Sequence, residues 1–134
     1  MLHITRRGDY AIRGMVYLAG QPADKVTLLG DMAAAVEASP AILAKIFQHL
    51  SKVGLVSSYR GTGGGFVLGR PAEAITLLEI VEAVEGPIIL NRCLIAKGTC
   101  GRDSFCPVHP VWGRVQEKMR SMLGEYTLKD LAGK

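Results

Sequence analysis

The chain has 134 residues, which suits one domain, or one domain with an added oligomerisation element. Apolar residues make up 49% and charged residues 21%, an ordinary balance for a globular protein, and no apolar run approaches the roughly 20 residues of a membrane span. The start lacks the continuous apolar core and cleavage site of a signal peptide. Three cysteines cannot pair completely, so we expect a reducing cytoplasm and no membrane partner.

The net charge of +4 is unevenly distributed along the chain. Residues 1–70 carry eight Lys and Arg against four Asp and Glu, whereas residues 71–134 carry eight of each sign. The whole excess therefore lies in the first half, which makes that half the candidate for contact with a polyanion.

Two helices are expected before residue 39. Apolar residues recur at helical spacing within residues 8–20, and Gly20 and Pro22 end that pattern. The segment after Thr27 is rich in alanine, which favours a second helix.

A third helix is expected to follow directly. Ser39 and Pro40 are typical of a helix start, the apolar pattern continues over residues 41–52, and Gly54 closes it. Two helices separated only by a tight corner predict a helix-turn-helix.

A β-hairpin is predicted after these helices. Residues 56–60 and 66–70 are strand-like, and the Gly-rich residues 61–65 form the turn between them. A hairpin in this position is a wing. The Gly-rich tip lacks the Lys-Ser/Thr pair of a P-loop, so we expect no nucleotide ligand.

The second half contains two more helices around a loop. Residues 76–79 form a capping box that opens a helix ending at Gly86. Pro110 opens a helix over about 111–124 whose apolar stripe fits packing onto its own domain or a dimer contact, and Thr127 caps a short last turn.

All three cysteines lie in the loop between these helices, where Cys93, Cys100 and Cys106 are followed by His109. Three thiolates and an imidazole can fill the coordination of a zinc ion or an iron–sulfur cluster. Thiol redox chemistry and inert buried thiols are the alternatives. Because residues 91–105 show no regular apolar period, the loop is expected to offer little core for burial, which favours metal binding.

Three segments together resemble the Rrf2 family of bacterial winged-helix transcription regulators: residues 8–13 (Gly-Asp-Tyr-Ala-Ile-Arg), residues 52–70 through the wing, and the cysteine loop. The resemblance covers nearly the whole chain. It implies a mainly α fold with a small β-wing, in which a winged helix-turn-helix domain is joined to a long C-terminal dimerisation helix. It also implies a homodimer that binds double-stranded DNA at a two-fold-related site.

The resemblance implies three parts: residues 1–86 as the DNA-binding domain, 87–109 as a cluster-binding loop, and 110–134 as the dimerisation helix with the C-terminal turn. It further implies a labile iron–sulfur cluster whose state sets DNA affinity, in response to iron–sulfur status, oxidative stress or nitric oxide.

Four residues match cluster ligands of the family. Cys93, Cys100 and Cys106 match the cluster cysteines, and His109 matches the histidine that completes a 2Fe–2S site in one branch. In another branch the fourth ligand is an aspartate from the partner's first helix, and Asp9 occupies that place. We favour His109, which lies three residues after Cys106, and a 2Fe–2S cluster over 4Fe–4S.

The resemblance also assigns DNA contacts to the start of the recognition helix and to the wing tip, namely Ser39, Ala41, Ile42, Lys45, Arg60 and Gly61. A helix N-terminus offers N–H groups to phosphate, and Lys45 can reach a phosphate or a guanine edge. Arg60 can enter a narrow minor groove. Ile42 fits a core position equally well, and Ala44 replaces a glutamate of the family.

Two other functions remain open at this point. A structural zinc module would keep DNA binding without sensing. A thiol enzyme would use one cysteine as nucleophile and His109 as base, but no orienting partner stands at an obvious spacing, so no enzymatic activity is expected.

Overall fold

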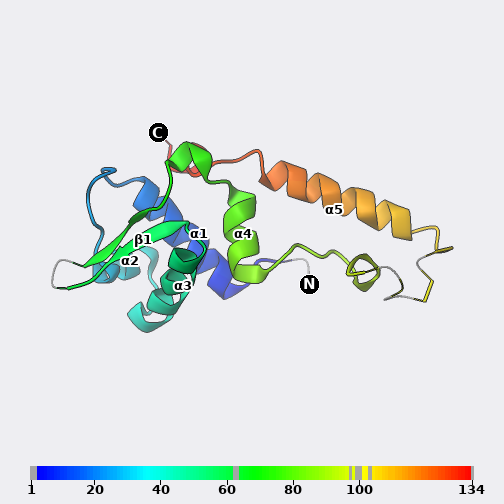
Figure 1. The fold of residues 1–134 in the computed structure, drawn as a ribbon, viewed down its shortest axis with the longest axis horizontal. Coiled ribbons are helices and arrows are strands. Elements are labelled where there is room, and N and C mark those ends of the chain that lie inside the picture. Colours follow the sequence, from blue (N-terminus) through cyan, green and yellow to red (C-terminus); the bar gives the residue numbers. More distant parts are fainter. Residues whose placement is uncertain (1–2, 62–63, 97, 99–100, 103, 134) are drawn as a thin grey trace.

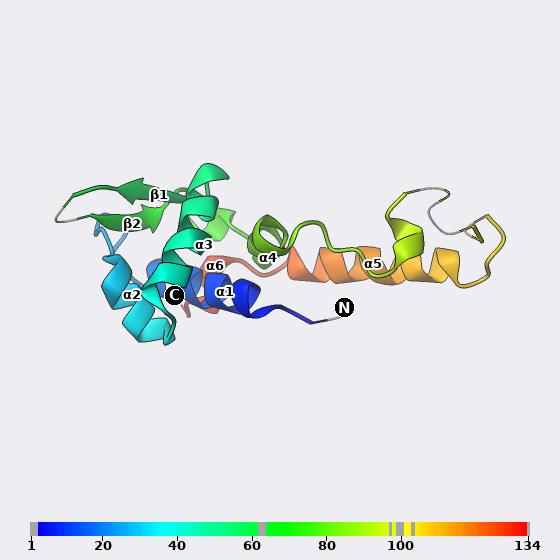
Figure 2. The ribbon, with the colours of Figure 1, turned by 90° about the horizontal axis from the view of Figure 1, so that it is seen from below.

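The computed structural model describes residues 3–61, 64–96, 98, 101–102 and 104–133. The molecule is elongated, with a compact body at one end and an arm that extends from it (Figures 1 and 2). Within the described residues, every helix is too short or too polar to span a bilayer.

The body is built on three helices, α1 (Arg6–Ala19), α2 (Leu29–Val36) and α3 (Pro40–Lys52). The Thr5 hydroxyl accepts the N–H of Gly8 and so caps α1. Glu37 ends α2 in the left-handed conformation, at φ 57°, and this residue turns the chain into α3. The predicted helix-turn-helix is therefore confirmed.

The predicted wing is also confirmed. Strands β1 (Val56–Tyr59) and β2 (Gly65–Leu68) pair antiparallel, with Val56 opposite Leu68. Thr27 forms an isolated antiparallel β-bridge with Phe66, through two backbone hydrogen bonds of 2.9 Å. Gly65 is required here, since a Cβ at this position would collide with the Thr27 carbonyl oxygen.

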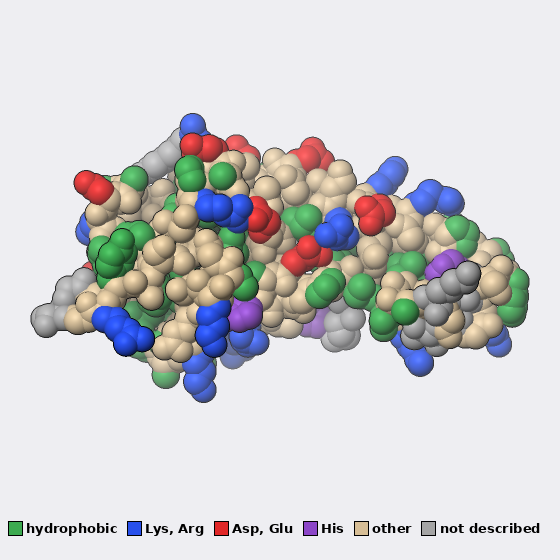
Figure 3. Space-filling view, in the orientation of Figure 1, with side chains coloured by type: hydrophobic (Ala, Val, Ile, Leu, Met, Phe, Trp, Pro, Cys, Tyr) green, Lys and Arg blue, Asp and Glu red, His purple; other side chains and the backbone are tan. Residues whose placement is uncertain are grey.

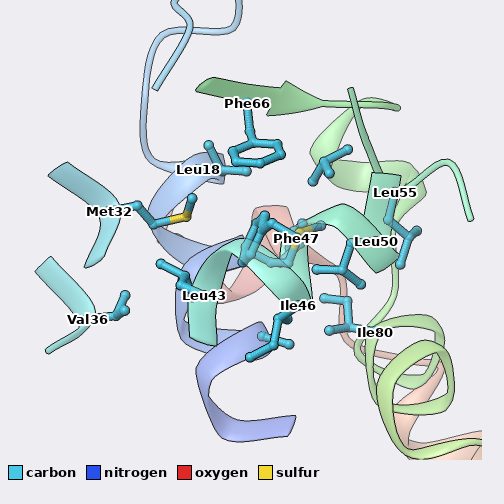
Figure 4. Packing of buried hydrophobic residues seen from close by; sticks show 14 of the residues in the cluster. Leu18, Met32, Val36, Leu43, Ile46, Phe47, Leu50, Leu55, Phe66 and Ile80 are labelled. Carbon is cyan, nitrogen blue, oxygen red and sulfur yellow. The ribbon is translucent and has the colours of Figure 1, made fainter. Parts of the chain in front are cut away.

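Phe47 of α3 lies at the centre of the core (Figure 4). Its ring meets that of Phe66 at a centroid distance of 5.4 Å and a tilt of 57°. The helix-turn-helix and the wing therefore share one core, whose buried members are Ala11, Met15, Leu18, Met32, Ala33, Val36, Leu43, Ile46, Phe47, Leu50, Leu55, Val56, Phe66, Ile75, Ile80 and Leu128.

The arm leaves the body and returns to it. After the short turn η1 (Ala72–Ala74), helix α4 (Leu77–Glu85) packs on α1, and the chain then runs outward to the short helix η2 (Arg92–Leu94). Helix α5 (His109–Leu123) brings the chain back (Figure 1), and α6 (Leu128–Leu131) docks on α1 and η1. The capping box predicted for α4 is present, and Thr127 caps α6 as predicted, there also through a capping box.

Two glycines in helices provide a matched test of this packing. A Cβ at Gly14 would lie 2.6 Å from Cζ of the buried Phe47, whereas a Cβ at Gly30 would meet nothing within 4 Å. We expect Gly14→Ala to lower the free energy of unfolding by about 1–3 kcal/mol through overpacking. Gly30→Ala should raise it by about 0.5–1 kcal/mol through helix propensity. Urea denaturation measures both, and equal effects would contradict the packing of α1 on α3.

Candidate DNA-binding face and cysteine arm

The outward face of α3 is fixed by what the helix buries. Leu43, Ile46, Phe47 and Leu50 point into the core, so the opposite side faces solvent. The exposed side carries all four residues expected there, namely Ser39, Ala41, Ile42 and Lys45, together with Gln48 and Lys52. Ile42 is 45% exposed and lies outside the core, so the structure excludes the core position that its sequence equally allowed.

The start of α3 leaves backbone donors available. Ser39 precedes the helix in an extended conformation, and its side chain makes no capping hydrogen bond. The N–H groups of the first turn, where Pro40 supplies none, have no partner within the helix. Such a helix end attracts a phosphate oxygen.

The wing carries an exposed cation close to its tip. Arg60 follows β1 directly and is exposed, and Gly61 takes φ 99°, a conformation that favours glycine. Lys and Arg side chains gather along the lower edge of the body in Figure 3, over the wing and α3. The wing and α3 belong to residues 1–70, the half of the chain that carries the charge excess.

Cys93 lies in η2 and is only 8% exposed. The Asn91 side chain caps this turn by accepting the N–H of Arg92 at 2.9 Å, and η2 packs against α5. The expectation that the loop offers little core is therefore wrong for Cys93. The reason is tertiary, since η2 packs against a helix that begins sixteen residues after Cys93.

Cys106 and His109 are brought together by a turn at the start of α5. The Cys106 N–H donates to the Arg102 carbonyl at 2.7 Å, and the His109 N–H donates to the Cys106 carbonyl at 3.2 Å. Nδ1 of His109 is buried and has no hydrogen-bond partner among the described residues. A buried polar atom without a partner costs on the order of 1–3 kcal/mol, so this nitrogen is suited to a ligand.

Cys100 lies outside the described residues. In the part of the chain that the structure describes, no three His, Cys, Asp or Glu side chains come together to hold a metal ion. The expected four-ligand set therefore stays a prediction.

Asp9 is engaged within its own chain. Its carboxylate pairs with Arg13 at 2.6 Å, and this hydrogen bond raises the pKa of the Arg13 guanidinium. Arg13 also donates to the Val36 carbonyl at 3.1 Å, which ties α1 to the end of α2. Thr5, rather than Asp9, caps α1.

Helix α5 buries none of its residues completely, but it has two distinct apolar sides. One side is half-buried against its own chain and includes Trp112, Gly113, Gln116, Met119, Arg120 and Leu123. The neighbouring side is an exposed apolar stripe formed by Val111, Val115 and Met122. The packing onto its own domain that the sequence left open is therefore present on one side, and the dimer contact stays a prediction for the exposed stripe.

The sequence did not single out the polar residues that hold the arm. Glu82 pairs with Arg120, and the Gln116 carbonyl oxygen accepts the N–H of Leu90 at 2.8 Å. These partners stand 38 and 26 residues apart, so no local spacing could reveal them.

Comparisons with known proteins agree with this geometry. Residues 4–134 match the family model of Rrf2, described as an iron-dependent transcriptional regulator. The HTH-type transcriptional regulator IscR of Xenorhabdus nematophila is 35% identical over 130 residues, which cover 97% of this chain and 79% of that protein.

Two solved structures are similar over nearly the whole chain. CymR, the global cysteine regulator of B. subtilis, has a TM-score of 0.80 and 32% identity, covering 99% of this chain and 98% of that chain. IscR of T. potens has a TM-score of 0.77 and 26% identity, covering 97% and 85%.

The exposed wing cation leads to a test of DNA contact. We expect Arg60→Ala to weaken binding to an operator duplex by on the order of 1–3 kcal/mol, because a groove contact is lost. It should also reduce the salt dependence of binding, since fewer counterions are released. Fluorescence anisotropy at several salt concentrations measures both. Lys129→Ala, the same charge change on the exposed face of α6, is the control. Equal affinity of Arg60→Ala and wild type for every duplex would contradict the wing contact.

Proposed function

The chain belongs to the Rrf2 family of transcription regulators, and we propose that it senses iron–sulfur status, oxidative stress or nitric oxide through a cluster bound in its arm. Its relatives are transcription regulators, so the chain is a DNA-binding winged-helix protein and not an enzyme. The observation that carries the sensing proposal is the buried Nδ1 of His109, three residues after Cys106, which has no hydrogen-bond partner among the described residues.

The donor set fits an iron–sulfur cluster chemically. Cys93, Cys100 and Cys106 would supply three thiolates and His109 an imidazole, a mixed set that suits a 2Fe–2S centre. The positive end of the α5 dipole lies at His109, where it favours the negative charge of nearby thiolates. Asp9 is the less suitable fourth ligand, because its carboxylate is already paired with Arg13.

The bound group would supply an iron site whose loss or change of state reports oxidant, nitric oxide or iron scarcity. The residues of the chain translate that state into DNA affinity. With the cluster bound, the cysteines and His109 would hold the tip of the arm in one arrangement. Release of those side chains would remove the preference for that arrangement. Such a signal acts only through the difference in free energy between the two arrangements of the protein.

DNA recognition in this proposal uses six residues of the exposed face, namely Ser39, Ala41, Ile42, Lys45, Arg60 and Gly61. Two copies of that face, related by two-fold symmetry, would bind a two-fold-related operator. The exposed stripe of Val111, Val115 and Met122 supports a homodimer, because a helix with an unpaired apolar side gains free energy when a second copy covers it. The three parts with boundaries at 86/87 and 109/110 belong to the same proposal.

Regulation by thiol chemistry is the second candidate. It is favoured by the likeness to CymR, whose description as the global cysteine regulator connects that protein to cysteine. In this alternative Cys93, Cys100 and Cys106 would act as thiols without iron. Colour separates the two candidates, since iron–sulfur protein is brown and thiol protein is colourless.

The cluster proposal is tested on protein purified without oxygen. We expect the wild type to carry iron and acid-labile sulfide, and alanine at Cys93, Cys100 or Cys106 to remove most of both, because each thiolate is a ligand. Chemical iron and sulfide assays with visible absorption spectra measure this. A colourless wild type would favour thiol regulation, and full iron retention in Cys100→Ala would exclude that residue as a ligand.

The fourth ligand is tested by a matched pair of substitutions. We expect His109→Ala to change the visible and electron paramagnetic resonance spectra of the cluster and Asp9→Ala to leave them unchanged, because imidazole ligation affects the iron directly. The opposite pattern would assign the aspartate as the ligand.

Dimer formation is tested on the exposed side of α5. We expect Val115→Glu to shift the protein toward monomer in sedimentation experiments, because a buried unpaired charge opposes association. Arg114→Glu, on the polar side of the same helix, should remain dimeric. A dimer constant unchanged by Val115→Glu would exclude this stripe as the interface.

A further inference from the structure

The C-terminal half of α4 joins three parts of the molecule. Glu82 contacts the arm, the Ala83 carbonyl contacts the recognition helix α3, and the Glu85 carboxylate accepts a hydrogen bond from Thr5, the cap of α1. These three residues fall within four consecutive positions of one helix. A displacement of this turn would therefore change contacts with the arm and with the DNA-binding helices at the same time.

Glu82 holds both chain segments of the arm. Its carboxylate accepts two hydrogen bonds from Arg120 of α5, at 3.1 and 3.2 Å, and one from the N–H of Ile88 at 3.1 Å. Ile88 belongs to the segment that leaves the body, and Arg120 to the helix that returns to it. The bond with Arg120 lowers the pKa of Glu82, with a smaller lowering from the Ile88 N–H, and raises the pKa of Arg120. One carboxylate thus fixes the root of the arm.

The two segments of the arm are also tied to each other further out. The Gln116 side chain accepts the N–H of Leu90 at 2.8 Å, and η2 with Cys93 packs on α5 beyond that point. The outgoing segment and α5 therefore form one unit from the root to Cys93. A change at the cysteine loop reaches Arg120 through this unit.

The recognition helix is attached to the same turn of α4. His49 of α3 donates from Nε2 to the Ala83 carbonyl over 2.6 Å. This carbonyl is one of the last four of α4, which have no partner within the helix. The His49 side chain of the DNA-binding helix therefore supplies a hydrogen bond to the C-terminal end of α4. Its acceptor, the Ala83 carbonyl, belongs to the residue next to Glu82.

We infer that Glu82, Arg120 and His49 are positioning residues that couple the arm to the recognition helix, so that the state of the cysteine loop sets the orientation of α3. The identity of the signal rests on the proposed function, but the coupling itself does not. Coupling between two sites typically changes affinity on the order of 5- to 150-fold.

The Glu82–Arg120 pair is suited to coupling more than to holding the fold. The two side chains are 23% and 37% exposed, and pairs open to solvent contribute little to global stability. The core beneath α3 consists of apolar side chains and contains neither residue. Loss of the pair should therefore leave the protein folded and loosen the attachment of the arm.

The first test needs no cluster. In full-length, metal-free protein, Arg120→Met keeps most of the apolar stem and removes the paired charge. We expect amide hydrogen exchange in residues 40–52 to speed up at least about threefold while the urea midpoint stays near that of wild type. Arg114→Met, on the polar side of α5 where Arg114 makes no hydrogen bond or ion pair with the described residues, should leave exchange unchanged. Arg120→Lys, which keeps one charge, should fall between them.

Exchange that changes only in residues 86–95 and in α5 would overturn the inference, because Arg120 would then hold the arm without reaching α3. If Arg120→Met lowers the urea midpoint, the test uses Arg120→Lys and His49→Ala instead. The inference then again requires faster amide exchange in residues 40–52.

The second test measures the ratio of operator affinity between iron-loaded and metal-free protein. Arg120→Met and His49→Ala should both bring this ratio to within about twofold of unity, whereas Arg114→Met should keep the wild-type ratio. A wild-type ratio retained in Arg120→Met overturns the coupling and leaves the proposed function intact. A wild type without iron, or with a ratio of one, removes the proposed function, and the exchange result then decides the coupling alone.

Discussion

The burial of Phe47 is the constraint on which the DNA-binding face depends. This ring comes from the recognition helix itself and packs against Gly14 of α1, Met32 of α2 and Phe66 of the wing. Its position therefore sets which side of α3 faces the core and which side faces solvent. Rotation of the helix about its own axis is unfavourable, because it would take Phe47 out of the closely packed core. Recognition geometry is thus a consequence of core packing.

The body could be predicted closely because its signals are local. Ser39 and Pro40 define the start of α3, and the Thr76 capping box opens α4. Each is a statement about backbone groups within a few residues. The predicted and observed helix boundaries differ by only a few residues. The first helical pattern covered residues 8–20, whereas α1 begins at Arg6, the first residue after its cap. Local rules were sufficient for elements whose tertiary partners are their neighbours in the chain.

The arm could be predicted only in part, because its contacts join residues far apart in the chain. Nothing near Cys93 indicates that its turn packs on α5, and nothing near Glu82 indicates that its partner is Arg120. The cysteine spacing did predict a loop of metal-binding chemistry, and the turn that joins Cys106 to His109 is compatible with that prediction. What sequence could not supply is the surface against which the loop is held.

The body and the arm are stabilised by different kinds of interaction. The body has an apolar core, and any rearrangement that opens it has a high free-energy cost because several large side chains become exposed to water. In the arm, α5 has no fully buried residue, and its half-buried side is supplemented at the root by hydrogen bonds and an ion pair. Directional polar contacts can be exchanged for water at a small net cost, because their net contribution in water is on the order of 1 kcal/mol each.

This division suits a regulator whose DNA-binding face must keep its shape while its orientation changes. A rigid core preserves the side-chain arrangement of α3 and the wing in both states. In the proposed mechanism, polar contacts at the root would let the arm take two positions that differ by a few kcal/mol, a difference that a bound ligand can supply. If the root were apolar, the arm would be locked to the body, and a signal at the cysteine loop could not move α3 without unfolding the core. If the root had no contacts, the signal would not reach α3 at all. The Glu82 carboxylate, with its three hydrogen bonds, lies between these extremes.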